Sequence, residues 1–261
     1  MKEMINELVE YRQLLYMMAW RDIKIRYKQS VMGFLWAILM PMLIVAAGIV
    51  VKLAFSFVSG KNMAITDLAS ITIKALPWSF FISSIRVCTN SLTSNSNLVT
   101  KIFFPREIFP LSAIAANLFD FAIAALALTV ILACMNTGIS LYLLWLPLLF
   151  VILVIFTAGV GMFLACANLF FRDVKYIVEV ILTFAIFFTP VFYDASMFGK
   201  WAPLLLINPV GAILESIRTV VVLHQAPDPF WLSYAAFISV TTLMLSWVTF
   251  HRSEFMFAER I

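Results

Sequence analysis

Apolar runs alternate with short charged segments over most of this 261-residue chain. A run of about 20 apolar residues, coiled as an α-helix, spans the roughly 30 Å hydrocarbon core of a bilayer. The pattern predicts six membrane-crossing helices, at residues 31–56, 75–96, 109–135, 141–168, 174–193 and 229–250. An even number of crossings places both ends of the chain on the same side of the membrane.

The longest uncharged stretch lies between Asp120 and Arg172 and holds 51 residues without Asp, Glu, Lys or Arg. As one helix it would measure about 76 Å at about 1.5 Å per residue, enough for two crossings. Residues 136–140, with the sequence NTGIS, interrupt the stretch with turn-forming side chains. We therefore expect the third and fourth crossings to form a tight hairpin.

Two segments have patterns that do not fit a crossing. Residues 1–28 carry many charges, but their apolar positions recur at near-helical spacing, which predicts an amphipathic helix in the membrane interface. Residues 201–214 are uncharged, but Pro203, Pro209 and Gly211 interrupt them. Because they would reach only about 21 Å as a helix, we expect a re-entrant hairpin between the fifth and sixth crossings.

Composition agrees with a membrane protein. Hydrophobic residues make up 63% of the chain and charged residues 12%, with a mean hydropathy of +1.00. Soluble domains carry roughly 25% charged residues, so this chain cannot cover a water-exposed surface. The fold class we predict is an all-α integral membrane protein, which excludes a disordered chain, a soluble enzyme and a nucleic-acid-binding module.

Basic residues are distributed unevenly between the two predicted sides. Five lie on one side, at Lys52, Lys61, Lys74, Lys200 and Arg218, and Arg86 lies inside a crossing. The side that holds both termini has twelve, namely Lys2, Arg12, Arg21, Lys24, Arg26, Lys28, Lys101, Arg106, Arg172, Lys175, Arg252 and Arg260. Cytoplasmic loops are enriched in Lys and Arg, so both termini are predicted to be cytosolic.

Arg86 and Asp120 are the ionisable residues deepest inside predicted crossings. Each is about 11 residues, or roughly 16 Å, from the loop that joins the second and third crossings. Equal depth on consecutive helices predicts an intramembrane ion pair, because an unpaired charge there costs at least about 2.5 kcal/mol. Such a pair would either fix helix packing or line a passage. Glu179, by contrast, is expected to pair with Lys175 on its own helix.

Groups for catalysis are absent from the sequence pattern. Neither His224 nor His251 has a second His at ligand spacing, and the Gly-Lys pair at Gly60 and Lys61 lacks the glycine-rich phosphate loop. We therefore predict that the chain is no enzyme and has no metal or cofactor of its own. Asp120 is a single buried acid, which argues against an ion-coupled carrier. A transporter driven by a partner fits these features best.

The loop between the second and third crossings reads NSNLVTKIFFPREIFPLS, at residues 95–112. Asn95 and Ser96 can cap a helix, and Pro105 and Pro110 end it and restart the chain. The spacing predicts a short, rigid amphipathic helix on the cytosolic side. It would contact a cytosolic partner or rest on the membrane surface.

Several motifs resemble a known family. They are RDIKIRYKQSVMGFLWAILMP at 21–41, the loop SNLVTKIFFPREIFPLS, NLFFRDVKYI at 168–177, FFTPVFYD at 187–194, Asn208-Pro209 and the C-terminal FHRSEFMFAERI. They resemble, in order and over nearly the whole chain, the permease subunit of polysaccharide-exporting ABC transporters. The resemblance implies a single permease domain over residues 1–261 that exports lipid-linked O-antigen, teichoic acid or capsular polysaccharide across the bacterial inner membrane. It also implies a homodimer with two ATPase subunits, which bind the ATP and Mg.

The resemblance implies roles for two segments. Residues 97–107 would form the helix that couples to the ATPase, through Asn97, Leu98, Lys101, Phe104, Pro105, Arg106 and Glu107. The amphipathic helix at 1–28 would be a second contact, close to membrane lipid. Residues 195–218 match the family's outer gate hairpin, which includes Trp201, Pro203, Asn208 and Pro209.

The first and fifth crossings resemble the helices that line the family's channel. Aromatic rings pack against the CH faces of sugars without binding them strongly. The expected lining residues are Phe34, Trp36, Phe187, Phe188, Phe192 and Tyr193.

Three other functions remain open from the sequence. The first is a related ABC permease that exports a drug or another small amphiphile. The second is a membrane subunit that anchors or senses without transport. The third is an intramembrane enzyme, which the missing catalytic groups disfavour.

Overall fold

The computed structural model describes residues 2–28, 32–33, 35–59, 65–101, 104–134, 138 and 140–257, and all regular structure within these ranges is helical. The α-helices are α1 (Lys2–Glu10), α2 (Arg12–Lys28), α3 (Leu35–Ser59), α4 (Ile65–Ser94), α5 (Ser96–Lys101), α6 (Ile108–Cys134), α7 (Leu146–Phe170), α8 (Val174–Phe188), α9 (Ala202–Leu206), α10 (Pro209–Val221) and α11 (Pro229–Ser253). Three 3₁₀ helices complete them: η1 (Leu141–Trp145), η2 (Ala195–Trp201) and η3 (Glu254–Met256).

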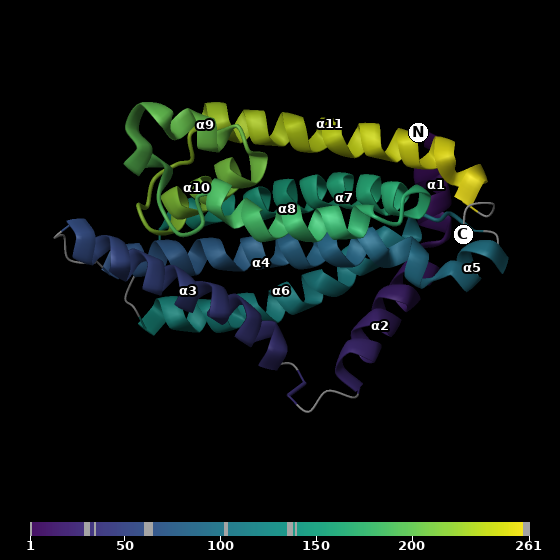
Figure 1. The fold of residues 1–261 in the computed structure, drawn as a ribbon, viewed down its shortest axis with the longest axis horizontal. Helices are drawn as coiled ribbons and strands as arrows, with labels where there is room; N and C mark the ends of the chain where they lie inside the picture. Colours follow the sequence, from purple (N-terminus) through teal and green to yellow (C-terminus); the bar gives the residue numbers. More distant parts are fainter. Residues whose placement is uncertain are drawn as a thin grey trace.

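The long helices form an elongated bundle with two distinct ends (Figure 1). Helices α4, α6, α7, α8 and α11 run along its length. Helices α1 and α5 lie at one end with the last turn of α11, and we call this the α5 end. Helix α9 lies at the other, which we call the α9 end. Helix α1 and the end of α11 therefore lie at the same end of the bundle.

Within the described ranges, five helical stretches are long and apolar enough to cross a membrane: 35–54, 66–94, 108–130, 141–170 and 229–256. They correspond to five of the six predicted crossings and make the chain a multi-pass membrane protein. The uncharged stretch after Asp120 contributes to two of them, and residues 135–137 and 139 of the predicted turn region lie outside the described part of the chain. Helix α4 begins at Ile65, ten residues before the predicted start of its crossing, and this brings Lys74 inside the helix.

The predicted crossing at 174–193 is shorter than expected. Helix α8 has 15 residues, about 22 Å, and falls short of the roughly 30 Å hydrocarbon core. The chain leaves helical geometry at Thr189, which is extended and precedes Pro190. Even so, α8 lies against α4 and α7 and leads the chain from the α5 end toward the α9 end (Figure 1).

The N-terminal amphipathic segment consists of two helices that meet at Tyr11. Helix α2 packs against α6, where Arg26 contacts Asp120. Asp120 lies 12 residues after the start of α6, about 18 Å along its axis. The end of α2 therefore lies level with the first half of α6, and its last residues stay partly or fully exposed. The placement of residues 1–28 in the membrane interface stays a prediction.

Helix α10 is enclosed by other helices. It lies against α4, α7 and α11, and nine of its 13 residues are buried. Gly211 permits a close approach of α10 to α9 and to the turn after α8, since a Cβ there would lie 2.7 Å from the Leu205 carbonyl oxygen and 3.0 Å from Pro190 Cδ. The segment after α8 is thus folded back into the bundle at the α9 end.

Candidate functional site

The predicted coupling segment lies at the α5 end. Helix α5 covers Ser96–Lys101, with Asn97 exposed and Leu98 half-buried. Residues 102–103 and the side chain of Lys101 lie outside the described part of the chain. A turn at 104–107 then leads into α6, so the described helix is shorter than the predicted 97–107.

Two of the four side chains in the turn at 104–107 point into the protein. Phe104 is buried beside Phe109, with ring centroids 5.4 Å apart, and Glu107 is only 2% exposed. Pro105 and Arg106 are partly exposed. Phe104 and Glu107 therefore face the interior of this chain, and their contact with the ATPase stays a prediction.

Arg106 joins this turn to the ends of two helices. Its Nη1 donates to the Glu254 carbonyl oxygen at 2.6 Å, and its Nη2 donates to the Val99 carbonyl oxygen at 3.2 Å. Its main-chain N–H donates to Glu254 Oε1 at 3.0 Å. The Val99 carbonyl lies in the last turn of α5, where carbonyls lack partners within the helix and a cation is favourable. The Glu254 carbonyl also accepts the Phe257 N–H within η3. One guanidinium thus binds carbonyls in both α5 and the C-terminal segment.

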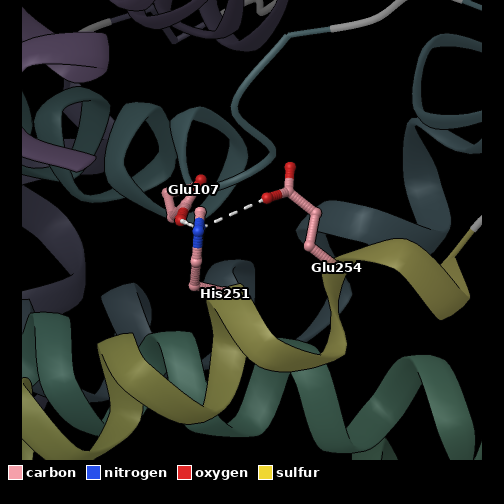
Figure 2. A group of neighbouring side chains, drawn as sticks. All are labelled: Glu107, His251 and Glu254. Atoms are coloured by element: carbon pink, nitrogen blue, oxygen red, sulfur yellow. Dashed lines mark ion pairs between the residues drawn. The ribbon is translucent and has the colours of Figure 1, made fainter. Parts of the chain in front are cut away.

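His251 lies between two carboxylates in the same region (Figure 2). Its Nδ1 is 3.5 Å from Glu107 Oε1 and 3.6 Å from Glu254 Oε2. Burial raises the pKa of Glu107, whose Oε2 has no hydrogen-bond partner among the described residues. The three side chains offer ligand atoms within 4.8 Å of one another, as a metal site would. Arg106 Nη1, 4.0 Å from Glu254, already supplies positive charge there.

The predicted ion pair between Arg86 and Asp120 is wrong. Arg86 binds Glu179 of α8 with two bonds, Nε to Oε1 at 2.6 Å and Nη2 to Oε2 at 2.9 Å. Asp120 accepts from Arg26 and Tyr27 of α2. Equal depth does not fix the direction in which a side chain points around its helix. The predicted pairing of Glu179 with Lys175 is replaced for the same reason.

A buried charge network at the α9 end was not predicted. It is centred on Asp194, which is 5% exposed and follows α8 directly. Lys74 Nζ lies 2.9 Å from Asp194 Oδ1, and Arg218 Nε lies 3.0 Å from the same oxygen. Ser70 Oγ donates to it at 2.8 Å. The network therefore connects α4, α10 and the turn after α8.

Two further contacts extend this network to α3. Lys52 Nζ lies 2.7 Å from Asp67 Oδ1 and 3.8 Å from Asp194 Oδ2. Glu215 completes it, 2.8 Å from Arg218 Nη1 and 3.7 Å from Lys74 Nζ. The sequence placed Lys52, Lys74 and Arg218 on the outer face. It missed their burial because Asp194 is 120 residues away from Lys74 in the chain. The sequence signal that could have indicated this burial is that Lys52, Lys74 and Arg218 lie beside long apolar runs.

The predicted channel-lining residues separate into two groups. Trp36, Phe187 and Phe188 are exposed, by 45%, 62% and 71%. Phe192 is 8% exposed and packs against α3, where its ring would meet a Cβ added to Gly48. Phe192 is therefore a core residue, and its assignment to a lining is wrong. Tyr193 is partly exposed and donates its hydroxyl to the Phe187 carbonyl at 2.8 Å. Phe34 lies outside the described residues.

The predicted gate residues lie at the α9 end. Trp201 and Pro203 are exposed. Asn208 caps α10 by accepting from the Val210 N–H at 3.1 Å, and its Nδ2 donates to Thr189 Oγ1 at 3.0 Å. Pro209 occupies the first position of α10, where proline is favoured. The hairpin from η2 to α10 is thus fastened to the end of α8 by a side-chain hydrogen bond.

Comparison with known proteins identifies the fold. The family model described as ABC-2 type transporter matches residues 13–222. The chain is similar to the O-antigen export system permease protein RfbA of Myxococcus xanthus, 29% identical over 264 residues that cover 100% of both chains. Two proteins of the same description from Klebsiella pneumoniae are 29% and 31% identical, covering 94% and 78% of each chain. With four-fifths of its length matched by the family model, this chain belongs to the ABC-2 type transporter family of membrane permeases.

Proposed function

We propose that this chain is the permease subunit of an ABC exporter that moves a lipid-linked polysaccharide across the bacterial inner membrane. The substrate is O-antigen-like or teichoic-acid-like, and the energy comes from ATP hydrolysis in a separate subunit. The observation that carries the proposal is the full-length similarity to an O-antigen export permease. Both termini and α5 then lie on the cytosolic side, as the distribution of basic residues also favours.

The α5 end is suited to receive force from an ATPase. Asn97 and Thr100 are exposed on α5, while Val99 between them is buried. Val99, Phe104 and Phe109 belong to one apolar cluster with Phe250 and Phe257 of the C-terminal segment. A helix that presents polar groups outward and is anchored by an apolar face moves as a unit with what it is anchored to.

A passage between two copies of the chain is supported by the surface of α8. Tyr176, Val180, Phe184, Phe187 and Phe188 are all more than half exposed. Arg86 and Glu179 form their ion pair on the α8 surface with side chains 49% and 44% exposed. A charge pair exposed to lipid is costly, so this surface requires water or another protein chain. A homodimer with a water-filled path along α8 supplies both.

In this arrangement α8 needs only to reach the α9 end, where the hairpin from η2 to α10 closes the path. We propose that α8 with the following turn residues 189–193 is the sixth crossing and that the hairpin is the re-entrant outer gate. The buried contacts of α10 support the hairpin's place within the bundle.

Export of a small amphiphile is the second candidate. A cavity of about 340 Å³ lies between α3, α4 and α6 and is lined almost entirely by apolar side chains, among them Met42, Val45 and Leu76. Cavities of this size accept a drug-sized ligand. The cavity is also the right kind of space for part of a lipid tail, so it does not require a small substrate.

Deletion of the gene in the source bacterium tests the proposal. We expect lipid-linked polymer to accumulate inside the cell and surface polymer to disappear, with both restored by the gene on a plasmid. Unchanged surface polymer together with new sensitivity to an amphiphilic drug would establish the second candidate instead.

A further inference from the structure

The C-terminal segment and the turn at 104–107 are joined by hydrogen bonds to which the proposed function gives no role. We propose that Glu254 is a positioning residue that fastens the turn at 104–107, and with it α5, to the end of α11. Displacement of α5 is then passed to α11 and is not absorbed by the turn. The part of this proposal that concerns force from an ATPase rests on the proposed function.

The first step is that Glu254 holds the backbone of the turn. Its Oε1 accepts the Arg106 N–H at 3.0 Å, and its carbonyl oxygen accepts Arg106 Nη1 at 2.6 Å. Arg106 is bound on its other side to the Val99 carbonyl of α5, at 3.2 Å. Three hydrogen bonds therefore lead from the last turn of α5 through Arg106 to a single residue at the end of α11.

The second step is that these hydrogen bonds are shielded from water. The side chains of Arg106 and Glu254 are 12% and 19% exposed. Phe250 and Phe257 on either side of Glu254 are fully buried, with ring centroids 5.1 Å apart. Charge-assisted hydrogen bonds are stronger when water is excluded, and they are short and directional. Such a contact resists shear better than an apolar patch alone, which can slide.

The third step is that α11 is itself rigidly held. Gly159 of α7 packs so closely on α11 that a Cβ there would lie 2.7 Å from the Leu243 nitrogen. Phe257 also packs against Phe170 at the end of α7, with centroids 6.0 Å apart. Motion given to Glu254 therefore reaches two long helices of the bundle.

A spin label on α5 tests the contact in the purified chain alone. The label is placed at Asn97→Cys, with Cys88, Cys134 and Cys166 replaced by alanine, and the chain is held in lipid nanodiscs. Glu254→Ala is expected to raise the mobility of the label, while Glu254→Gln keeps an acceptor oxygen and leaves mobility near the wild-type value. Asp228→Ala is the matched control, because it removes a capping carboxylate at the other end of the same helix.

A folded Glu254→Ala chain whose label is as immobile as in the wild type would overturn the proposal. If Glu254→Ala does not fold, Arg106→Lys takes its place. Lysine keeps the charge and the main-chain bond but cannot reach both carbonyls, so the label should again become more mobile. Unchanged mobility in a folded Arg106→Lys chain would equally overturn it.

The second measurement uses the chain with the ATPase that co-purifies with it from native membranes. In Glu254→Ala we expect the ATPase to remain bound and active while polymer exported per ATP hydrolysed falls about tenfold, the loss that one charge-assisted hydrogen bond predicts. Glu254→Gln should restore most of the polymer exported per ATP hydrolysed. A normal ratio in Glu254→Ala overturns the inference. A wild-type chain that binds no ATPase overturns the proposed function, and the spin-label result then judges the Glu254 contact independently.

Discussion

Lys74 Nζ lies 2.9 Å from the carboxylate of Asp194, and the two residues are 0% and 5% exposed. Lys74 belongs to α4, and Asp194 follows α8. Their contact fixes the end of the eighth helix against the fourth at the depth where the hairpin from η2 to α10 begins.

Loss of either Lys74 or Asp194 should lower the stability of the folded protein. Lys74→Met or Asp194→Asn leaves uncompensated buried charge, which typically destabilises a protein by about 3–5 kcal/mol. The double variant should lose less than the sum of the singles, because the two residues are coupled. Thermal unfolding in detergent measures the stability of the two single variants and of the double variant. Lys200→Met, an exposed lysine in η2, is the control and should stay near the wild-type value. Additive losses would show that the pair is not coupled.

The pair of Arg86 and Glu179 should affect transport more than stability. Both side chains are nearly half exposed, and exposed pairs contribute about 0–1 kcal/mol. Arg86→Glu and Glu179→Arg alone should each reduce surface polymer, and the swapped double variant should recover it at unchanged Tm. Combining Arg86→Glu with Asp120→Arg should give no recovery, because Asp120 contacts α2. Recovery in that second combination would contradict the observed pairing.

The exposed and buried aromatic residues should respond differently to truncation. Phe187→Ala with Phe188→Ala removes two exposed rings, so the chain should stay folded while export of long polymer falls. Phe192→Ala removes a buried ring and should destabilise the chain by about 3–5 kcal/mol. Surface polymer length and Tm distinguish the two effects. Normal export of long polymer by the folded double variant would refute an aromatic lining.

Glu107 should make stability depend on pH. Burial raises its pKa above the value in the unfolded chain, so its contribution to stability is present at low pH and is lost as pH rises through the folded pKa. Gln at this position cannot ionise. The Tm of Glu107→Gln relative to the wild type should therefore increase as pH rises. Unfolding curves at several pH values check this, and a relative Tm that decreases with pH would contradict it.

Hydropathy predicted most of the fold because a membrane imposes a length on each apolar helix. Five helical stretches of crossing length, among the described residues, follow from that constraint. The shortness of α8 did not follow, since residues 189–193 carry no charge that would mark the end of an apolar run. Helical geometry ends at Thr189, just before Pro190, a change in backbone geometry that hydropathy does not record.

The site was predicted less well than the fold. Position along the chain gives the depth of a charge but not the direction it faces, so Arg86 was matched to Asp120 and not to Glu179. Asp194 looked like an ordinary turn residue, and Glu254 like part of a tail. Their roles arise from partners in distant parts of the chain, which no single segment of sequence can indicate.

The charge network at the α9 end has an electrical consequence. When all of its members are ionised, Lys52, Lys74 and Arg218 balance Asp67, Asp194 and Glu215. Moving a net charge through the membrane potential requires about 2.3 kcal/mol per elementary charge for each 100 mV, and a neutral group moved as a unit requires none. If the proposed gate moves this network as a unit, its opening and closing require no work against the membrane potential.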